Sequence, residues 1–275
     1  MSNASAMPER RRTASPLSIT SGIICGRCAA VTASTSAPCT ARVRPQTGPA
    51  ITRVRSSTRT PDSGRGKLST FIDLRDAGGR ETLAGLARGA DIFVQGYRPG
   101  AIGGNGFGPE EVARQRPGIV YVSLCAYGHE GPWANRRGFD SLVQNANGIN
   151  HAEAEAAGSA QPKPLPCQAL DHGAGFLMAF GAMTALARRA TQGGSWHVRV
   201  SLAQTGHWIR RLGRVANGLA CPDPGPEAVR DRLEEIDSGF GRLTTVRHAA
   251  TMPETPPRWA RPSVPLGTHA AEWPG

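Results

Sequence analysis

From about residue 68 onward, apolar positions follow strand-like and helix-like spacings in alternation. Short apolar or alternating runs bounded by turn residues predict strands, and apolar residues repeating every three or four positions predict helices. The strands are expected at 68–74, 91–94, 118–125 and 195–202, and the helices at 78–88, from 109, at about 139–148, at 171–189 and at 203–215. Strands that alternate with helices favour βαβ units, and therefore an α/β fold around a parallel sheet.

The longest uncharged apolar stretch runs from Ala174 to Ala187, fourteen residues between His172 and Arg188. A membrane-spanning helix needs roughly 20 such residues. The stretch therefore predicts a helix buried in the core, and no membrane partner is expected. No apolar run near the N-terminus is long enough for a secretory signal.

Charge is distributed unevenly along the chain. Residues 1–66 contain ten Arg, two acidic residues and no aromatic residue, so they carry +8 of the total formal charge of +11. Such a segment buries too little apolar surface to offset the entropy of ordering it. We therefore expect a disordered or aberrant basic segment over 1–63, the α/β domain over 64–215, and an irregular Pro-rich segment over 216–275.

The basic N-terminal segment admits three interpretations: a disordered tail, an organelle transit peptide, or an out-of-frame translation of a GC-rich gene. The chain has thirty Arg against two Lys, and its character changes abruptly at 64–67, which favours the third. Charge alone permits nucleic-acid binding. The segment lacks interleaved aromatic residues and any recognisable nucleic-acid motif, so no nucleic-acid partner is expected.

Cysteine usage indicates a reduced, cytoplasmic protein. Six Cys are scattered along the chain and do not form a disulfide framework. Cys25 and Cys28 make a C-x-x-C pair to which Cys39 could add a third ligand, but no fourth Cys or His lies near them. A zinc site usually takes four ligands, so no metal is expected.

Two loops follow predicted strands, where parallel sheets bind ligands. In 95–100, glycines permit close backbone approach, Tyr97 offers a stacking face and Arg98 a fork for phosphate. An ordinary glycine-containing surface turn is the alternative interpretation. The second loop, 126–133 and then 136–140, is long enough to be functional, although it too can be an ordinary connection.

Asp171 stands at the start of the apolar helix. It can be a simple helix N-cap. The same position also suits a nucleophile, because backbone N–H groups and the helix dipole favour an ionised carboxylate that can attack a thioester carbonyl. Gly173 and Gly175 leave room for a bulky substrate, and His172 is expected on the helix surface rather than as a general base.

Five segments in this order resemble class III CoA-transferases. The resemblance runs from about residue 64 to 214, and no single motif decides it. The segments are Val94 to Ala101, Ile119 to Trp133, Arg137 to Asp140, Leu170 to Gly175 and Gly193 to Leu202.

The resemblance implies an open, Rossmann-like α/β domain with flanking helices, a second small domain and an interlocked homodimer. It implies transfer of CoA from an acyl-CoA to a carboxylic acid acceptor, with coenzyme A as substrate and no metal. Asp171 would attack the acyl-CoA to give an aspartyl-acyl anhydride and then an aspartyl-CoA thioester. The residues implied to line CoA are Ile72, Asp73, Leu74, Arg75, Gly96, Tyr97, Arg98, Arg137, Gly138, Phe139 and Asp140.

The chain also departs from the family pattern. The usual first βα unit is not recognisable in 1–63, Gly96 stands where Asn is common, and no clear small domain follows Arg214. A small domain that is largely missing makes an inactive, truncated relative an alternative to an active transferase. Related 2-methylacyl-CoA racemases need a His where this chain has Phe139, which cannot transfer a proton.

Overall fold

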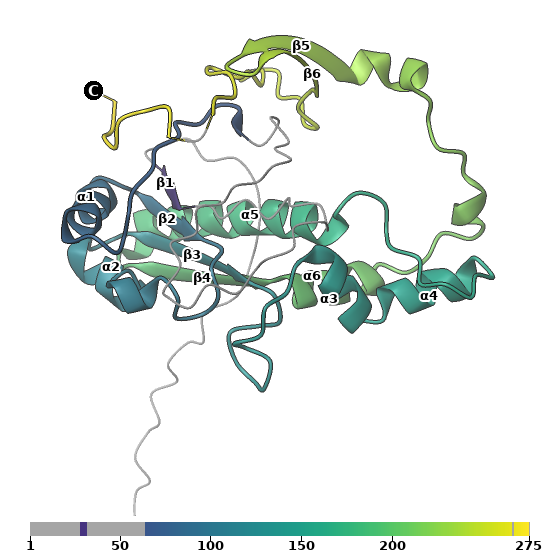
Figure 1. The fold of residues 1–275 in the computed structure, drawn as a ribbon, viewed down its shortest axis with the longest axis horizontal. Coiled ribbons are helices and arrows are strands. Elements are labelled where there is room, and N and C mark those ends of the chain that lie inside the picture. The colour runs from purple at the N-terminus through teal and green to yellow at the C-terminus, as the bar shows by residue number, and fades with distance from the viewer. Residues whose placement is uncertain (1–27, 32–63, 266, 275) are drawn as a thin grey trace, which may run out of the picture.

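The computed structural model describes residues 28–31, 64–265 and 267–274. Its centre is a four-stranded parallel sheet in the order β1-β2-β3-β4 (Figure 1). The strands are β1 (Cys28–Val31), β2 (Ile92–Gln95), β3 (Val120–Cys125) and β4 (Trp196–Ser201). Helices α1 (Ala77–Arg88) and α2 (Pro109–Gln115) pack on one face and α5 (Ala169–Gln192) on the other. The predicted α/β class with a parallel sheet is confirmed.

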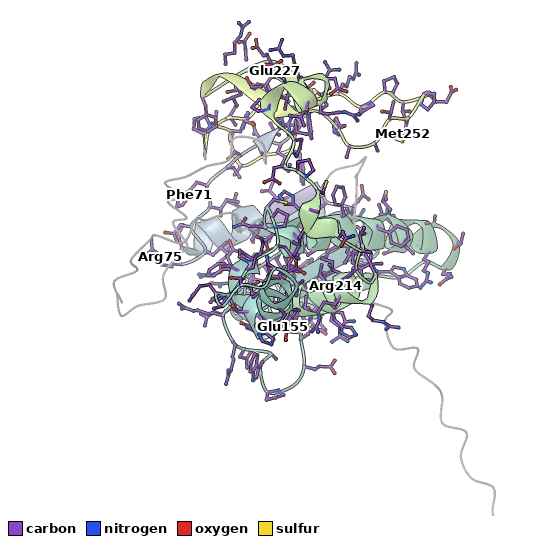
Figure 2. All side chains as sticks on the ribbon, turned by 90° about the vertical axis from the view of Figure 1, so that its right-hand side faces the viewer. Phe71, Arg75, Glu155, Arg214, Glu227 and Met252 are labelled. Carbon is purple, nitrogen blue, oxygen red and sulfur yellow. The ribbon has the colours of Figure 1, made fainter. Side chains whose placement is uncertain are left out.

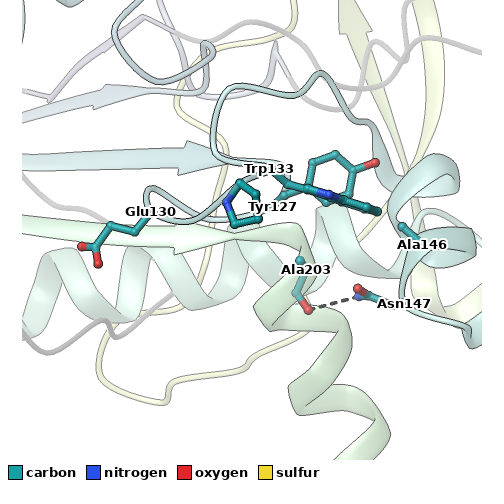
Figure 3. Close-up of a pocket in the computed structure, with 7 residues that line it drawn as sticks. Tyr127, Glu130, Trp133, Ala146, Asn147 and Ala203 are labelled. Carbon is teal, nitrogen blue, oxygen red and sulfur yellow. Dashed lines mark hydrogen bonds between the residues drawn. The ribbon is translucent and has the colours of Figure 1, made fainter.

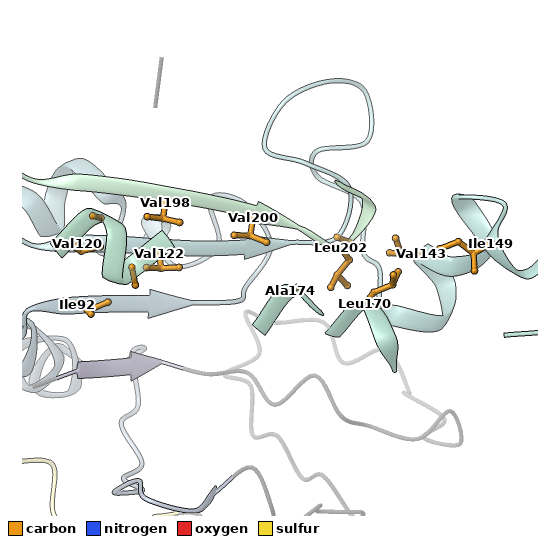
Figure 4. Packing of buried hydrophobic residues seen from close by; sticks show 13 residues of the cluster. Ile92, Val120, Val122, Val143, Ile149, Leu170, Ala174, Val198, Val200 and Leu202 are labelled. Atoms are coloured by element: carbon orange, nitrogen blue, oxygen red, sulfur yellow. The ribbon is translucent and has the colours of Figure 1, made fainter. Parts of the chain in front are cut away.

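Successive side chains of a strand point to opposite faces of the sheet, so the strands contribute to an apolar core on each face. Val120 and Val122 of β3 belong to the apolar cluster beneath α5, together with Val198 and Val200 of β4 (Figure 4). The intervening residue Tyr121 belongs to the cluster beneath α1 and α2. Burying one such aliphatic side chain contributes roughly 1.5–3 kcal/mol. The continuous apolar run of β3 is explained by helices covering both of its faces.

Helix α5 forms where a core helix was predicted, and at 24 residues it is longer than expected. It is not buried all round as predicted: Phe176, Phe180 and Met183 are 62%, 50% and 40% exposed. Small residues face the sheet: Ala174, Gly181, Ala182 and Ala185 are all buried. They let the helix axis lie close to the valines of β3 and β4. Among the described residues, no helix is both long and apolar enough to cross a membrane.

The helix predicted at about 139–148 is present, and a second helix that was not predicted follows it directly. Helix α3 (Asp140–Ala146) ends before Gly148, and α4 (Ile149–Ala156) begins after it. Gly148 has a φ of +71°, a left-handed conformation that interrupts the helix and that glycine adopts without strain. The pattern predicted a loop where α4 lies. Helix α6 (Leu202–Arg211) follows β4 and ends four residues before the predicted end of 215.

The predicted strand at 68–74 is wrong, since these residues have no strand structure. The backbone of Ser69 instead pairs with His269: the His269 N–H donates to the Ser69 carbonyl oxygen at 2.8 Å, and the Ser69 N–H donates to His269 Nδ1 at 3.0 Å. Ile72 and Leu74 pack against the core beneath α1 and α2. Phe71 is 61% exposed, at the surface (Figure 2). The alternation of this segment reflects packing beside the C-terminal segment rather than pairing within the sheet.

The C-terminal segment contains an antiparallel hairpin that the pattern did not predict, β5 (Leu233–Ser238) with β6 (Gly241–Val246). The buried guanidinium of Arg65 ties it to the start of the domain, donating to Thr245 Oγ1 at 2.7 Å and to the carbonyl oxygen of Val246 at 3.0 Å. Arg65 also lies 4.5 Å from the ring centroid of Trp259. Short 3₁₀ helices occupy Gly103–Asn105, Gly218–Ala220 and Pro226–Arg232.

Strand β1 lies inside the segment expected to be disordered or aberrant, and it pairs in parallel with β2. The remainder of that segment, 1–27 and 32–63, is outside the described residues. The expectations placed on it, including those for Cys25 and Cys39, therefore stay predictions.

Candidate functional site

The candidate site lies where β3 and β4 end. Ala126 directly follows β3, and its carbonyl oxygen accepts a hydrogen bond of 2.9 Å from the N–H of Ala203, in the first turn of α6. Helix α5 precedes β4 and returns along the sheet, so its first turn, which holds Asp171, lies at the same edge. In parallel sheets this edge binds ligands.

Gly138 lets the start of α3 approach this edge closely. A Cβ on Gly138 would lie 2.6 Å from the Cβ of Ala126 and 2.9 Å from the ring of Tyr127. Real Cβ atoms do not make contacts this short, so only glycine fits without a shift. The close approach sets the position of Asp140, two residues later.

Asp140 is 2% exposed, and both of its carboxylate oxygens accept hydrogen bonds. Oδ2 accepts from the backbone N–H groups of Leu170 and Asp171, at 2.7 and 3.0 Å. Oδ1 accepts from Nε2 of Gln144, one turn further along α3. Among the predicted site residues, Asp140 and Asp171 are thus brought into direct contact. Both carboxylate oxygens of Asp171 are buried, whereas His172 is exposed, as expected.

A pocket of about 340 Å³ opens at the same edge (Figure 3). Its walls come from the loop after β3, the end of α3 and the start of α6. Trp133 stands edge-on to Tyr127 with ring centroids 5.1 Å apart, and the Arg136 guanidinium lies 4.4 Å from the Trp133 ring centroid. The lining residues are Tyr127, Glu130, Pro132, Trp133, Ala146, Asn147 and Ala203. Aromatic walls beside a few polar groups suit an apolar or planar part of a ligand.

Of the predicted CoA residues 72–75, Ile72 and Leu74 pack against the other layer, beneath α1 and α2. Arg75 is exposed and paired with Asp73, its Nη2 lying 2.7 Å from Asp73 Oδ2 (Figure 2). The hydrogen-bonded Arg75 guanidinium holds the pKa of the Asp73 carboxyl below its ordinary value. A phosphate at Arg75 would have to compete with this carboxylate.

The other predicted CoA residues differ in exposure. Tyr97 is half-buried, and burial raises the pKa of its phenol. Its backbone N–H donates to Gln95 Oε1 at 2.8 Å. Arg98 and Arg137 are exposed, and Phe139 is 54% exposed. The two arginines are therefore accessible to an anionic ligand.

The structure also contains a partly buried polar cluster that the pattern did not reveal, on the sheet face opposite α5. Ser123 Oγ lies 2.9 Å from Nε2 of His129 and 2.8 Å from Nε2 of His197. Burial, with the neighbouring His129, lowers the pKa of His197 to about 4. Burial raises the pKa of the Cys125 thiol to about 11, so the thiol stays protonated and a poor nucleophile. Strand alternation places Ser123 and His197 on one face, but His129 comes from a loop that no periodicity positions.

No group of three or more His, Cys, Asp or Glu side chains is placed to hold a metal ion in the part of the chain that the structure describes.

A family model, CoA-transferase family III, matches residues 43–217, well over half of the chain. The chain belongs to this family. The match begins inside the N-terminal segment that was expected to be aberrant. The suspected resemblance to class III CoA-transferases is confirmed.

The curated proteins to which this chain is similar carry the names of CoA-transferases. It is 29% identical to the probable fatty acyl-CoA transferase Rv3272 of Mycobacterium tuberculosis, over 61% of this chain and 44% of the relative. It is 33% identical to the acetyl-CoA:oxalate CoA-transferase of Acetobacter aceti, over 50% of this chain and 35% of the relative. The chain spans less than half the length of these curated relatives.

Solved structures agree with the family. The crystal structure of Rv3272 matches with a TM-score of 0.51 and 28% identity, over 55% of this chain and 42% of that chain. A crystal structure of a mutant of Rv3272 matches with a TM-score of 0.65, over 76% of this chain and 82% of that chain. At 19% identity, this second likeness bears on the fold alone.

Proposed function

We propose that the chain transfers CoA between carboxylic acids, with Asp171 as the nucleophile. The observation that carries the proposal is the place of Asp171 in the first turn of α5, at the carboxyl edge of a family III sheet. The backbone N–H groups of a first helical turn favour an ionised carboxylate. An ionised carboxylate is the form that attacks a thioester.

The proposed reaction passes through three covalent intermediates: an anhydride with the donor acyl group, a thioester with CoA and an anhydride with the acceptor acyl group. An Asp171 oxygen attacks the acyl carbonyl carbon of acyl-CoA; a C–O bond forms, the C–S bond breaks, and an aspartyl-acyl anhydride and CoA thiolate result. The thiolate attacks the Asp171 carbonyl carbon, releasing the donor carboxylate and leaving an aspartyl-CoA thioester. The acceptor carboxylate attacks this thioester and expels the thiolate, which then takes the new acyl group and regenerates Asp171. Proton transfer is not required at any step.

CoA carries several phosphate charges, and we propose that exposed arginines bind them. Arg98 and Arg137 are open to solvent, and Arg75 would exchange Asp73 for a phosphate oxygen. A guanidinium binds phosphate through paired hydrogen bonds. The further residues proposed to line CoA are Ile72, Asp73, Leu74, Gly96, Tyr97, Gly138 and Phe139. Asp140, which the resemblance also implied, is buried with both carboxylate oxygens bonded to Gln144, Leu170 and Asp171, and is not proposed as a CoA contact.

The aromatic pocket is proposed to take the acyl group or another planar part of the substrate. Asp140 begins α3, and Ala146 in the pocket wall ends it, about 9 Å further along the helix axis. The pocket and the first turn of α5 thus flank the same short helix. An interlocked homodimer and a cytoplasmic location are further proposals.

The direct test measures CoA transfer from an acyl-CoA to a panel of carboxylic acids. The wild-type chain is expected to transfer CoA, and Asp171→Asn to lose at least about 10³-fold in kcat, because an amide is a poor nucleophile. His172→Gln, at the exposed neighbouring position, is the matched control and is expected to keep its activity. Full activity of Asp171→Asn would refute the assignment. A folded wild-type chain that transfers nothing would favour an inactive relative.

The same preparation addresses the racemase alternative. Phe139 has no group that can move a proton at the position where racemases of the family have a His. We therefore expect no exchange of the α-hydrogen of a 2-methylacyl-CoA with deuterated water.

A further inference from the structure

Helix α5 lacks a cap of its own. Its N-cap residue is Gln168, whose side chain makes no capping hydrogen bond. An N-cap side chain ordinarily accepts from the N–H groups of the second or third helical residue. In α5 these are Leu170 and Asp171, and both donate instead to Oδ2 of Asp140. Asp140 precedes them in the chain by thirty and thirty-one positions.

Gln144 extends this contact to the segment before the helix. Its Nε2 donates to Asp140 Oδ1, and its Oε1 accepts a hydrogen bond of 2.9 Å from the backbone N–H of Leu165. Gln144 is 2% exposed, as is Asp140. Two buried side chains on one turn of α3 therefore hold the chain at Leu165, Leu170 and Asp171.

We propose that Asp140, oriented by Gln144, is a positioning residue for Asp171. It fixes the backbone that carries the nucleophilic carboxylate and does not itself touch the reacting atoms. Nucleophilic attack needs the reacting atoms at a near-contact distance and angle, so a small shift of the first turn of α5 slows the covalent step. The inference rests on the proposed transferase function, because the orientation of the Asp171 carboxylate matters only if this carboxylate reacts.

The hydrogen-bond directions in this network are fixed, which yields a sharp test. The Leu165 group that contacts Gln144 is the backbone N–H, so Gln144 must turn its oxygen toward Leu165 and its amino group toward Asp140. In Asp140→Asn the new amide has two orientations. In one, its amino group faces the amino group of Gln144; in the other, it faces the N–H of Asp171, so a donor meets a donor in either case. Gln144→Glu sets two acceptors against each other. Each single variant breaks one link although its shape is nearly unchanged.

The double variant Asp140→Asn with Gln144→Glu restores every donor–acceptor pair. The introduced asparagine accepts from Leu170 and Asp171 with its oxygen and donates to the introduced glutamate. The glutamate in turn accepts from the Leu165 N–H. Net charge and side-chain volume are those of the wild-type pair. Asn145→Asp, an exposed amide-to-acid change on the same helix, is the matched control.

Steady-state CoA transfer of the full chain is the first measurement. Each single variant is expected to lose about 10²-fold in kcat with KM for acyl-CoA changed less than about threefold, and the double variant to recover to within about fivefold of wild type. Asn145→Asp should match wild type. A rise in KM that the double variant does not reverse would mean that Asp140 binds the substrate directly, and would overturn the proposal.

Amide hydrogen exchange of the segment 165–171 is the second measurement, and it does not depend on activity. Exchange is expected to be faster in each single variant and to return to the wild-type rate in the double variant. Unchanged exchange in Asp140→Asn would overturn the proposal. If the wild-type chain transfers no CoA while exchange follows this pattern, the proposed function fails and the Asp140–Gln144 contact to the first turn of α5 stands.

Discussion

Gly206 of α6 packs directly against the side chain of Asn147, at the pocket wall. A Cβ on Gly206 would collide with Asn147 Nδ2 and would lie 3.3 Å from Cδ2 of Leu170. Asn147 Nδ2 also donates to the carbonyl oxygen of Ala203 at 3.1 Å. The close approach of α6 therefore depends on the absence of a side chain at one position.

Gly206→Ala is expected to destabilise the protein by about 1–3 kcal/mol, because overpacking outweighs the helix propensity that alanine gains. Gly175→Ala is the matched control in the interior of α5, where nothing lies within 4 Å of an added Cβ. It should stabilise by about 0.5–1 kcal/mol. Urea unfolding of both variants measures the free energy of unfolding. Stabilisation by both substitutions would contradict the packing described.

The aromatic wall of the pocket provides a test of substrate binding. Trp133→Ala removes a ring that is 41% exposed and is expected to raise KM for acyl-CoA about tenfold, with kcat changed less than twofold. Trp208→Ala removes a ring of similar exposure, 44%, that does not line the pocket, and KM should be unchanged. Equal effects of the two substitutions on KM would show that the pocket does not receive substrate.

The half-buried histidines His129 and His197 predict a pH dependence of stability. In the folded chain the pKa of His197 is about 4, below its ordinary value of 6.5, and burial also lowers the pKa of His129. Between pH 6.5 and 4 the unfolded chain binds protons that the folded chain excludes, so the free energy of unfolding falls as pH falls through this window.

Thermal unfolding across this pH range measures the effect. His197→Gln should flatten the fall in the melting temperature, since glutamine does not titrate. His172→Gln, at an exposed position, should leave the slope as in wild type. A slope that is unaffected by His197→Gln would show that the histidine is not held neutral by its surroundings.

The sequence predicted those parts of the fold that have a strong apolar pattern. Strand β3 and helix α5 both have long apolar runs, and both were expected. The run of β3 is explained by helices on both faces of the sheet, whereas α5 buries only one side and leaves Phe176 and Phe180 exposed. The hairpin of β5 and β6 was not predicted because its exposed positions carry charged and small polar residues, a composition that is typical of loops. The prediction of a strand at 68–74 was wrong because apolar and polar residues also alternate in an irregular extended segment that buries one side.

The candidate site was predictable only in part. The place of Asp171 at a helix start could be inferred from the apolar residues that follow it. The contact with Asp140 could not, since it joins residues thirty-one positions apart through one carboxylate oxygen. Local patterns contain no information about such a contact, which depends on how α3 and α5 meet.

Covalent capture of the nucleophile tests the central claim most directly. The protein is incubated with acyl-CoA and hydroxylamine, digested, and analysed by mass spectrometry for a hydroxamate at Asp171. An anhydride or thioester at this carboxyl reacts with hydroxylamine, so the account predicts modification of Asp171 that requires acyl-CoA. The modification should be absent from Asp171→Ala and present in His172→Gln. Modification at another carboxylate, with Asp171 unchanged, would contradict the account.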